Sequence, residues 1–234
     1  LSVTGEYYGV EKTIEKEFTV FAKKTGGSPS CHTVNPFSVA DQETSPNGIA
    51  FSTDGRKMFI VGSVGDDVNE YSLSIPYCLS TAKFVDATSI SAQDTTPTDI
   101  AFNSDGTKMF ILGAASDEIN EYALSTGFDA SSRSFTDVVR VNTQETAVSG
   151  IAFNSDGTKM FIVGFAGDDV NEYALSTAFD ASTRSFTDAT SISSQETNPK
   201  AIAFNSDGTK MFIVGGAGDD VNEYALSTAF DAST

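Results

Sequence analysis

Hydrophobic residues recur in short stretches with a period of two, and these stretches return along the chain at one fixed interval. A block spanning 49–59 comes back at 100–110, 151–161 and 202–212, so the period is 51 residues. A period of this length corresponds to one supersecondary unit per repeat, stacked or arranged in a ring. The spacing therefore indicates a repeat architecture before any single residue is considered.

The third unit shows which strands the pattern predicts. A short apolar strand at 151–153 is followed by Asp-Gly, a strong signal for a hairpin turn. The continuous apolar run 159–164 is typical of a strand buried on both faces, and 170–176 alternates. A polar fourth strand is expected at 190–195. Four antiparallel strands per unit predict an all-β fold, a β-propeller built from about four blades of 51 residues each.

The segment Ile-Ala-Phe-Asn-Ser-Asp-Gly-Thr-Lys-Met-Phe-Ile-Val-Gly at 151–164 resembles the strand–turn–strand core of TolB-type and YVTN-type propeller repeats. It is more loosely similar to WD repeats, from which it departs because the chain has no tryptophan and no Gly-His pair. The resemblance covers residues 37–234. It implies a propeller fold and says little about activity, because function is carried by sites rather than by folds.

Two arrangements of the ends stay open. Residues 1–30 form a divergent segment and 31–234 the propeller repeats, with 38–44 matching the predicted fourth-strand segment 191–197. If 31–48 supplies an outer strand to the last blade, the ring closes and hides its strand edges. Residues 18–25 also resemble a third strand, so 1–48 would instead belong to an earlier blade of a larger ring.

Composition limits the partners. Thirty-two acidic residues against fourteen Lys and Arg give a net charge of −18, which argues against binding to nucleic acids or anionic membranes. No apolar run is long enough for membrane insertion.

The two cysteines, Cys31 and Cys78, fall in loops of neighbouring units. A disulfide between them would suit a location outside the cytoplasm, although equivalent points on adjacent blades are usually too far apart. The sequence leaves open whether the two cysteines are bonded or free. His32 completes no metal or nucleophile constellation with Cys31, so we expect a solvent-facing loop histidine.

Acidic pairs recur at the turn before each third strand. Carboxylates repeated around a ring could bind Ca²⁺, the one cofactor that the sequence suggests. The alternative is that Asp favours a tight turn by bonding its own backbone. These pairs are Asp66 and Asp67, Asp117 and Glu118, Asp168 and Asp169, and Asp219 and Asp220.

Some propeller hydrolases hold a central metal with acids and amides at the starts of the innermost strands. The equivalent positions here are Asn47-Gly48, Thr98-Asp99, Ser149-Gly150 and Lys200-Ala201. One acid, one amide and a lysine do not make a set of four metal ligands. This composition argues against an enzyme.

The copies differ at few places. Units three and four agree at 32 of 33 positions, and the one difference sets Phe165 against Gly216, where Ser63 and Ala114 stand in the other units. The residues before each first strand also vary, and both stretches are expected on one face of the propeller. This pattern indicates either a diversified recognition surface or drift in tolerant loops. Exposed Phe165 is the sharpest candidate for stacking on a sugar or a partner side chain.

These observations favour a non-enzymatic binding or scaffold module outside the cell or on a cell, fibre or virion surface. Its expected partner is a glycan or a protein, bound through the variable-loop face. One alternative is a structural building block that self-assembles into a larger ring or fibre. A second alternative is a metal-dependent propeller hydrolase or lactonase.

Overall fold

The computed structural model describes residues 3–7, 10–14, 31 and 36–234. The chain divides into two compact units, Leu1–Ser30 and Cys31–Thr234. In the first unit, β1 (Val3–Tyr7) and β2 (Val10–Ile14) pair as an antiparallel hairpin. His32 and the third-strand resemblance of 18–25 lie outside the described residues.

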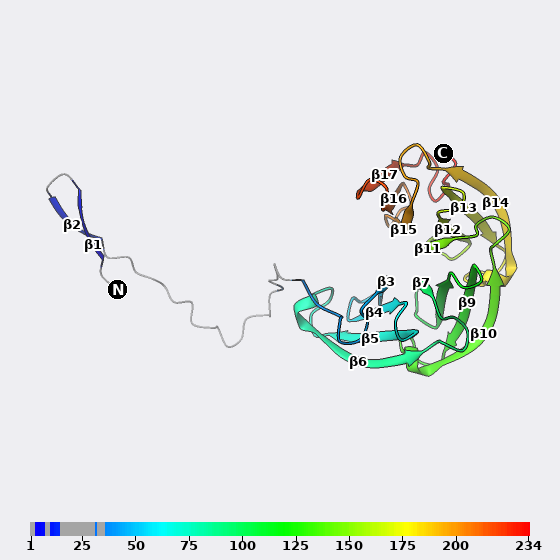
Figure 1. Cartoon of the computed structure of the whole chain (residues 1–234), viewed down its shortest axis with the longest axis horizontal. Coiled ribbons are helices and arrows are strands. Elements are labelled where there is room, and N and C mark those ends of the chain that lie inside the picture. Colours follow the sequence, from blue (N-terminus) through cyan, green and yellow to red (C-terminus); the bar gives the residue numbers. More distant parts are fainter. Residues whose placement is uncertain (1–2, 8–9, 15–30, 32–35) are drawn as a thin grey trace. The chain divides into compact units, whose positions relative to one another are not determined.

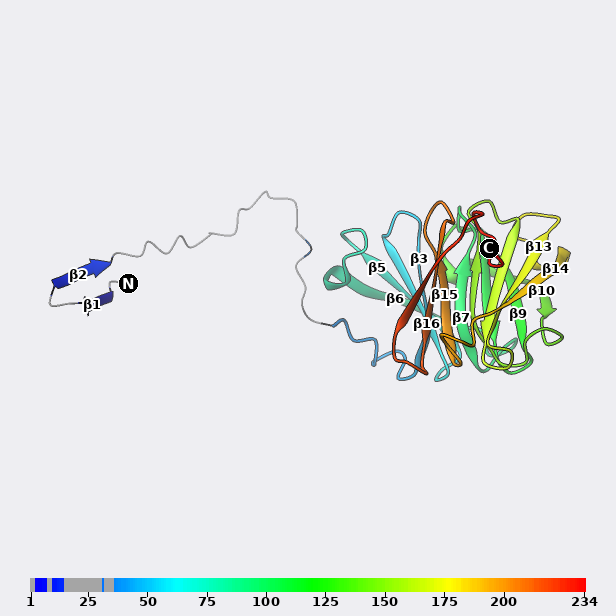
Figure 2. The same ribbon diagram turned by 90° about the horizontal axis from the view of Figure 1, so that it is seen from above.

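The second unit is a propeller of four antiparallel sheets, each forming one blade. Figure 1 shows the blades side by side around an arc, with β3, β7, β11 and β15 at its inner edge. Seen from above in Figure 2, the strands run between two faces of loops. The first blade contains β3 (Pro46–Phe51), β4 (Lys57–Gly62), β5 (Asp67–Leu73) and β6 (Ala82–Ser89); the second β7 (Pro97–Phe102), β8 (Lys108–Gly113), β9 (Glu118–Leu124) and β10 (Arg133–Arg140); the third β11 (Val148–Phe153), β12 (Lys159–Gly164), β13 (Asp169–Leu175) and β14 (Arg184–Ser191); and the fourth β15 (Pro199–Phe204), β16 (Lys210–Gly215) and β17 (Val221–Ala225).

The core lies between the blades rather than within them. On β8, Met109 and Ile111 pack against Phe59 and Val61 of the preceding blade. The alternate side chains of β8, such as Phe110, pack on the following blade. This explains the continuous apolar run in each second strand, because both of its faces are buried. The predicted all-β propeller is confirmed.

A polar network repeats at each internal boundary. Lys57 Nζ donates to Glu70 Oε1 at 2.7 Å and to the Phe128 carbonyl of the next blade at 2.6 Å. Glu70 Oε2 accepts from the Ala130 N–H, also in the next blade, at 3.4 Å. The same contacts recur with Lys108 and with Lys159. At each internal boundary, therefore, one lysine and one glutamate of a blade hydrogen-bond to the backbone of the next blade.

The hairpin turns after the inner strands follow their sequence signal. Gly106 has a φ of +72°, which a glycine adopts without strain. Asp105 Oδ1 accepts hydrogen bonds from the backbone N–H and the hydroxyl of Thr107, at 3.0 and 2.6 Å. The Thr107 hydroxyl bond, more than any other contact, lowers the pKa of Asp105 below its usual value. The turn explains why Asp-Gly-Thr is repeated in units two to four.

The outer strands differ from the prediction. The fourth strand of the third blade is Arg184–Ser191, earlier than the expected 190–195. Residues 38–44, expected to supply an outer strand, contain a turn at 40–42 and no strand. The last blade accordingly has three strands, in the order β15-β16-β17.

The four blades form an open arc in this structure. Ile49 of the first blade is 53 % exposed, whereas the equivalent Ile100 is 3 % exposed. Val221 of the last blade is 61 % exposed, whereas the equivalent Val170 is fully buried. Both differences arise because no blade covers these two faces.

A disulfide joins Cys31 to Cys78, with an S–S distance of 2.10 Å and Cα atoms 5.6 Å apart. Cys78 is completely buried just before the short 3-10 helix Leu79–Thr81. The bond crosses 47 residues of sequence and ties the start of the propeller unit to the first blade.

Removing the glutamate of one internal boundary tests the network. Glu121→Ala should lower the free energy of unfolding by about 2 kcal/mol, because it leaves the Ala181 N–H without its acceptor and Lys108 without its carboxylate partner, with only the Phe179 carbonyl remaining. Glu223→Ala is the matched control, since Glu223 forms the same ion pair but its side chain is 52 % exposed, against 6 % for Glu121. Its cost should stay below about 0.5 kcal/mol. Urea unfolding followed by circular dichroism measures both; equal effects would contradict the assignment.

Candidate functional site

A pocket of about 350 Å³ lies where the inner strands of all four blades begin. Each blade contributes the same position of the repeat: Asn47, Thr98, Ser149 and Lys200. The sequence had singled out these four positions, and the structure brings them together. The remaining lining residues are Pro46, next to Asn47, and Phe165. Pro46 belongs to the variable stretch before the first inner strand, but it was not named as a site residue.

Hydrogen bonds across the blades fix two of these side chains. Asn47 Nδ2 donates to the Pro97 carbonyl at 3.0 Å, and Ser149 Oγ donates to the Pro199 carbonyl at 2.7 Å. Each bond runs from one inner strand to the next. These two residues thus help to hold the wall of the pocket, while Lys200 is exposed at its edge.

Phe165 and Lys200 form the clearest contact in the pocket. The Lys200 ammonium lies 4.2 Å from the centre of the Phe165 ring, within the range of a cation–π interaction. The ring comes from the third blade and the lysine from the fourth. Phe165 remains 42 % exposed, so the pair presents both an apolar surface and a positive charge.

The two variable stretches of the repeat lie side by side. The Phe165 N–H donates to the Ala147 carbonyl at 3.1 Å, and the Gly216 N–H donates to the Asn198 carbonyl at 3.0 Å. Ser63 and Ala114 make the same backbone bond in the first two blades. Ser63, Ala114 and Gly216 do not line the pocket, so only Phe165 of this set enters it.

Asp99 is the acid among the inner-strand positions, and it does not line the pocket. Its side chain is half-buried and accepts from the Ile100 N–H at 2.8 Å and, in the next blade, from the Ile151 N–H at 2.9 Å. Burial raises its pKa to about 7, although both backbone bonds favour the ionised form. Asp99 therefore changes charge near neutral pH.

The acidic turns stand apart from the pocket, one per blade. Asp66, Asp117, Asp168 and Asp219 have φ between 51° and 53°, a left-handed conformation that Asp tolerates better than most residues. The Asp168 carbonyl accepts from the Ile192 N–H at 2.8 Å, which ties the turn to the segment after the fourth strand. Each of these four residues is followed directly in the sequence by a second acidic residue: Asp67, Glu118, Asp169 and Asp220.

Among the residues that the structure describes, no three His, Cys, Asp or Glu side chains gather into a group that could hold a metal ion. The residues at the inner-strand positions do not fit the central metal of the hydrolase hypothesis. Ca²⁺ binding at the acidic turns stays a prediction.

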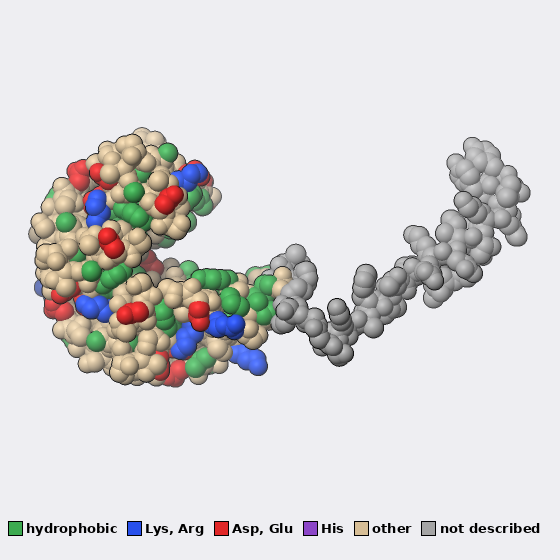
Figure 3. Space-filling model, turned by 180° about the vertical axis from the view of Figure 1, so that it is seen from behind, with side chains coloured by type: hydrophobic (Ala, Val, Ile, Leu, Met, Phe, Trp, Pro, Cys, Tyr) green, Lys and Arg blue, Asp and Glu red, His purple; other side chains and the backbone are tan. Residues whose placement is uncertain are grey.

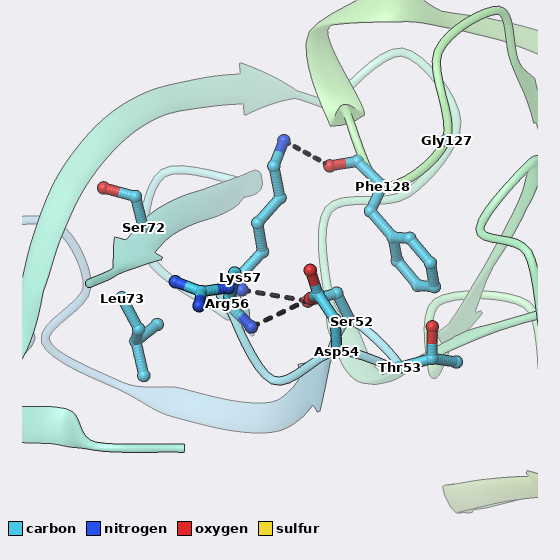
Figure 4. A pocket seen from close by; sticks show the side chains of 9 residues that line it. All are labelled: Ser52, Thr53, Asp54, Arg56, Lys57, Ser72, Leu73, Gly127 and Phe128. Carbon is cyan, nitrogen blue, oxygen red and sulfur yellow. Dashed lines mark hydrogen bonds between the residues drawn. The ribbon is translucent and has the colours of Figure 1, made fainter. Parts of the chain in front are cut away.

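A second cavity, of about 510 Å³, opens near the Asp-Gly turn of the first blade (Figure 4). Its polar atoms largely satisfy one another: Ser52 Oγ donates to Asp54 Oδ1 at 2.6 Å, and Lys57 Nζ reaches the Phe128 carbonyl. The lysine contact recurs at every internal boundary. We therefore assign this cavity to the joint between blades. Its lining residues are Ser52, Thr53, Asp54, Arg56, Lys57, Ser72, Leu73, Gly127 and Phe128.

No family model matches the sequence, and no curated protein matches it. Solved structures do match. A proposed 6-phosphogluconolactonase from Bacteroides uniformis is 13% identical with a TM-score of 0.56, covering 80% of this chain and 52% of its own. The periplasmic gluconolactonase PpgL of Pseudomonas aeruginosa is 16% identical with a TM-score of 0.52, covering 77% of this chain and 49% of its own.

The Cps50 (Swd1) β-propeller domain of Myceliophteria thermophila is 10% identical with a TM-score of 0.52, covering 78% of this chain and 54% of its own. The chain thus spans about half the length of the solved chains it matches. At these identities the likeness shows the propeller fold alone. Membership of the TolB or YVTN type stays a prediction.

The comparisons correct the functional expectation. A non-enzymatic binding or scaffold module was favoured, and an enzyme was disfavoured, because the inner-strand residues make no metal set. Both expectations are contradicted, since proteins named as lactonases stand among the similar propellers. In the part of the chain that is described, no helix has the length and hydropathy to cross a membrane.

The pKa of Asp99 leads to a prediction about stability. A folded-state pKa of about 7, above the ordinary 3.8, means that the folded protein binds this proton more tightly than the unfolded chain. The stability it contributes is present below pH 3.8 and is lost as the pH rises toward 7. From about pH 5 to about pH 8 the parent should lose about 1–3 kcal/mol more than Asp99→Asn does.

Thermal unfolding at the two pH values measures this difference. Asp137→Asn, which changes an exposed carboxylate on the outer strand β10, is the control and should follow the parent. Parallel pH profiles for the parent and Asp99→Asn would show that the carboxyl has an ordinary pKa.

Proposed function

We propose that the chain is a hydrolase that opens a small sugar-acid lactone in the pocket at the inner strands. The observation that carries this proposal is the convergence of Asn47, Thr98, Ser149 and Lys200, one from each blade, around about 350 Å³. A concave site with a few convergent polar groups is the usual form of a small-molecule site. The named lactonases among the similar propellers add support.

The chemistry of the lining suits such a substrate. Hydroxyl and amide groups at Thr98, Ser149 and Asn47 can hydrogen-bond the hydroxyls of a sugar-derived ring. The ring of Phe165 offers a face for its apolar side. Lys200 supplies a positive charge for a phosphate or for the carbonyl oxygen as it becomes negative. A phosphorylated lactone is accordingly the favoured substrate.

The lining residues that the structure describes include no carboxylate, and Asp99, whose two oxygens accept backbone N–H bonds, does not line the pocket. Water would therefore attack the lactone carbonyl while Lys200 stabilises the oxygen that becomes negative. The acyl–oxygen bond of the ring then breaks, the leaving oxygen takes a proton from water, and the attacking water releases a proton to the solvent. The product is the open hydroxy acid.

The disulfide also bears on location. A buried Cys78 bonded to Cys31 supports a place outside the cytoplasm, where disulfides persist. A periplasmic enzyme among the similar propellers agrees with this. Display on a cell, fibre or virion surface is a finer hypothesis, to be tested by locating the protein in its source.

Acid release from 6-phosphoglucono-δ-lactone and from glucono-δ-lactone, measured in a pH-stat above the spontaneous rate, tests the function. Lys200→Ala should lower kcat/KM for the phosphorylated lactone by about 10- to 100-fold and affect the other lactone less. Lys210→Ala, which removes a lysine outside the pocket, is its control.

Asp99→Asn should leave kcat for both lactones close to that of the parent, because its carboxyl lies outside the pocket. If the parent does not exceed the spontaneous rate on either lactone, lactonase activity is excluded. If it does and Lys200→Ala keeps full activity, the reaction occurs elsewhere in the molecule.

A further inference from the structure

In each blade, three repeat positions meet near the pocket: two residues where the inner strand begins, and one residue of the loop between the second and third strands. In the first blade these are Ser45, Asn47 and Ser63. Ser63 Oγ donates to Ser45 Oγ at 3.2 Å, and Asn47 Nδ2 donates to Ser63 Oγ at 3.4 Å. A side chain at one of these positions therefore takes room from the other two.

The third and fourth blades divide this space in opposite ways. In the third blade the loop residue is large and the two residues of the inner strand are small. In the fourth blade the loop residue is a glycine and the two residues of the inner strand are longer. The sets are Ala147, Ser149 and Phe165 in the third blade, and Asn198, Lys200 and Gly216 in the fourth. The sizes at the three positions thus compensate one another within a blade.

Gly216 gives this room to the lysine. A Cβ at Gly216 would lie 2.8 Å from Asn198 Nδ2 and 3.4 Å from Lys200 Cε. The backbone does not require a glycine there, because its φ is not positive and its N–H makes the same bond to a carbonyl as the N–H of Phe165. The missing side chain is therefore explained by its neighbours and not by the backbone conformation.

Phe165 receives the lysine from the other side. Its ring belongs to the preceding blade and lies 4.2 Å from the Lys200 ammonium, so the pair gains a cation–π interaction. A side chain at position 216 would fill the space from which the lysine extends toward this ring. The direction of Lys200 is thus set by an empty position in its own blade and by an aromatic ring in the preceding blade.

The direction of Lys200 matters because the other polar groups of the pocket have their donors in use. Asn47 Nδ2, Thr98 Oγ1 and Ser149 Oγ each donate to a backbone carbonyl, at 3.0, 3.2 and 2.7 Å. Their remaining lone pairs suit the hydroxyl groups of a ligand better than an anionic oxygen. Lys200 is the one charged side chain among the lining residues that the structure describes.

The surroundings do not attract anions. The chain has a net charge of −18, and Figure 3 shows acidic side chains, in red, spread over this face of the blades. A negative field of this kind lowers the local concentration of anions. Selectivity for an anion in the pocket therefore depends on where Lys200 points.

We propose that Gly216 and Phe165 together make the pocket selective for a sugar with one anionic group, because they direct Lys200 into it. Gly216 is a positioning residue, since it acts through the lysine. The anionic group lies at the Lys200 ammonium, and the hydroxyl groups of the same ligand donate to the acceptors of the other lining residues. The choice of a sugar phosphate rests on the proposed function, whereas the direction of Lys200 can be measured without any turnover.

The ring of Phe165 provides a spectroscopic readout on the full chain. In ¹H–¹³C NMR spectra of the parent, the ε-methylene protons of Lys200 should be shifted upfield by the ring current, and Lys200→Arg identifies their signal. Gly216→Val should remove this shift, because its methyl groups fill the space that the lysine uses. Ala114→Val is the matched control, since it makes a similar change at the same repeat position of the second blade, away from the lysine. It should leave the signal in place.

Binding of glucose 6-phosphate and of glucose, measured by titration calorimetry, tests the selectivity. The parent should bind the phosphorylated sugar at least about 10-fold more tightly, because only this sugar forms a charge-assisted hydrogen bond with Lys200. Gly216→Val should lose most of this preference and bind glucose as the parent does. Ala114→Val should keep the preference, and circular dichroism confirms that each variant folds.

The outcomes separate this inference from the proposed activity. If Gly216→Val keeps both the shifted Lys200 signal and the preference for the phosphorylated sugar, the role of Gly216 is wrong. A parent that binds the two sugars equally, or binds neither, would overturn the selectivity for an anionic group. Failure of the proposed function looks different: neither lactone releases acid above the spontaneous rate, while the NMR shift and the sugar preference remain.

Discussion

The structure depends on one constraint, which is that every second strand must bury both of its faces. A blade cannot satisfy this alone, because its sheet is only one layer thick. Phe110 needs the blade that follows and Met109 needs the blade that precedes. Blades are thus stable only in series, and the energy of the fold is concentrated in the joints. The same constraint accounts for the exposed valines at the end of the arc.

The sequence predicted the inner part of each blade well and the outer part poorly. The run 159–164 was predicted with the bounds that the structure gives, because a strand buried on both faces is continuously apolar. The outermost strand Arg184–Ser191 is almost wholly exposed, so burial leaves no periodic signal in it. Ile192, which is buried, follows this strand, so the predicted range 190–195 falls mostly on the segment after the strand.

The pocket was predictable only in part, for a related reason. The period of 51 residues fixes which positions occur at the start of each inner strand, so Asn47, Thr98, Ser149 and Lys200 could be named together. The contact of Phe165 with Lys200 depends on the angle between two blades, which no local pattern encodes. The raised pKa of Asp99 likewise depends on how closely its neighbours approach. A Cβ on Gly48 would lie only 2.7 Å from the Asp99 Cα, so the first blade must carry a glycine there.

The repeats also separate residues of the joints from residues of the site. The lysine and the glutamate of the joint are the same in all four blades, because every boundary has the same geometry to satisfy. The four inner-strand positions of the pocket carry four different residues on the same backbone. Because the joints are identical, the equivalent inner-strand side chains of the four blades converge on one pocket. Substitutions at these four positions make the pocket asymmetric without altering the scaffold. An asymmetric ring of polar groups can orient a small substrate, which four identical side chains would bind in several equivalent poses.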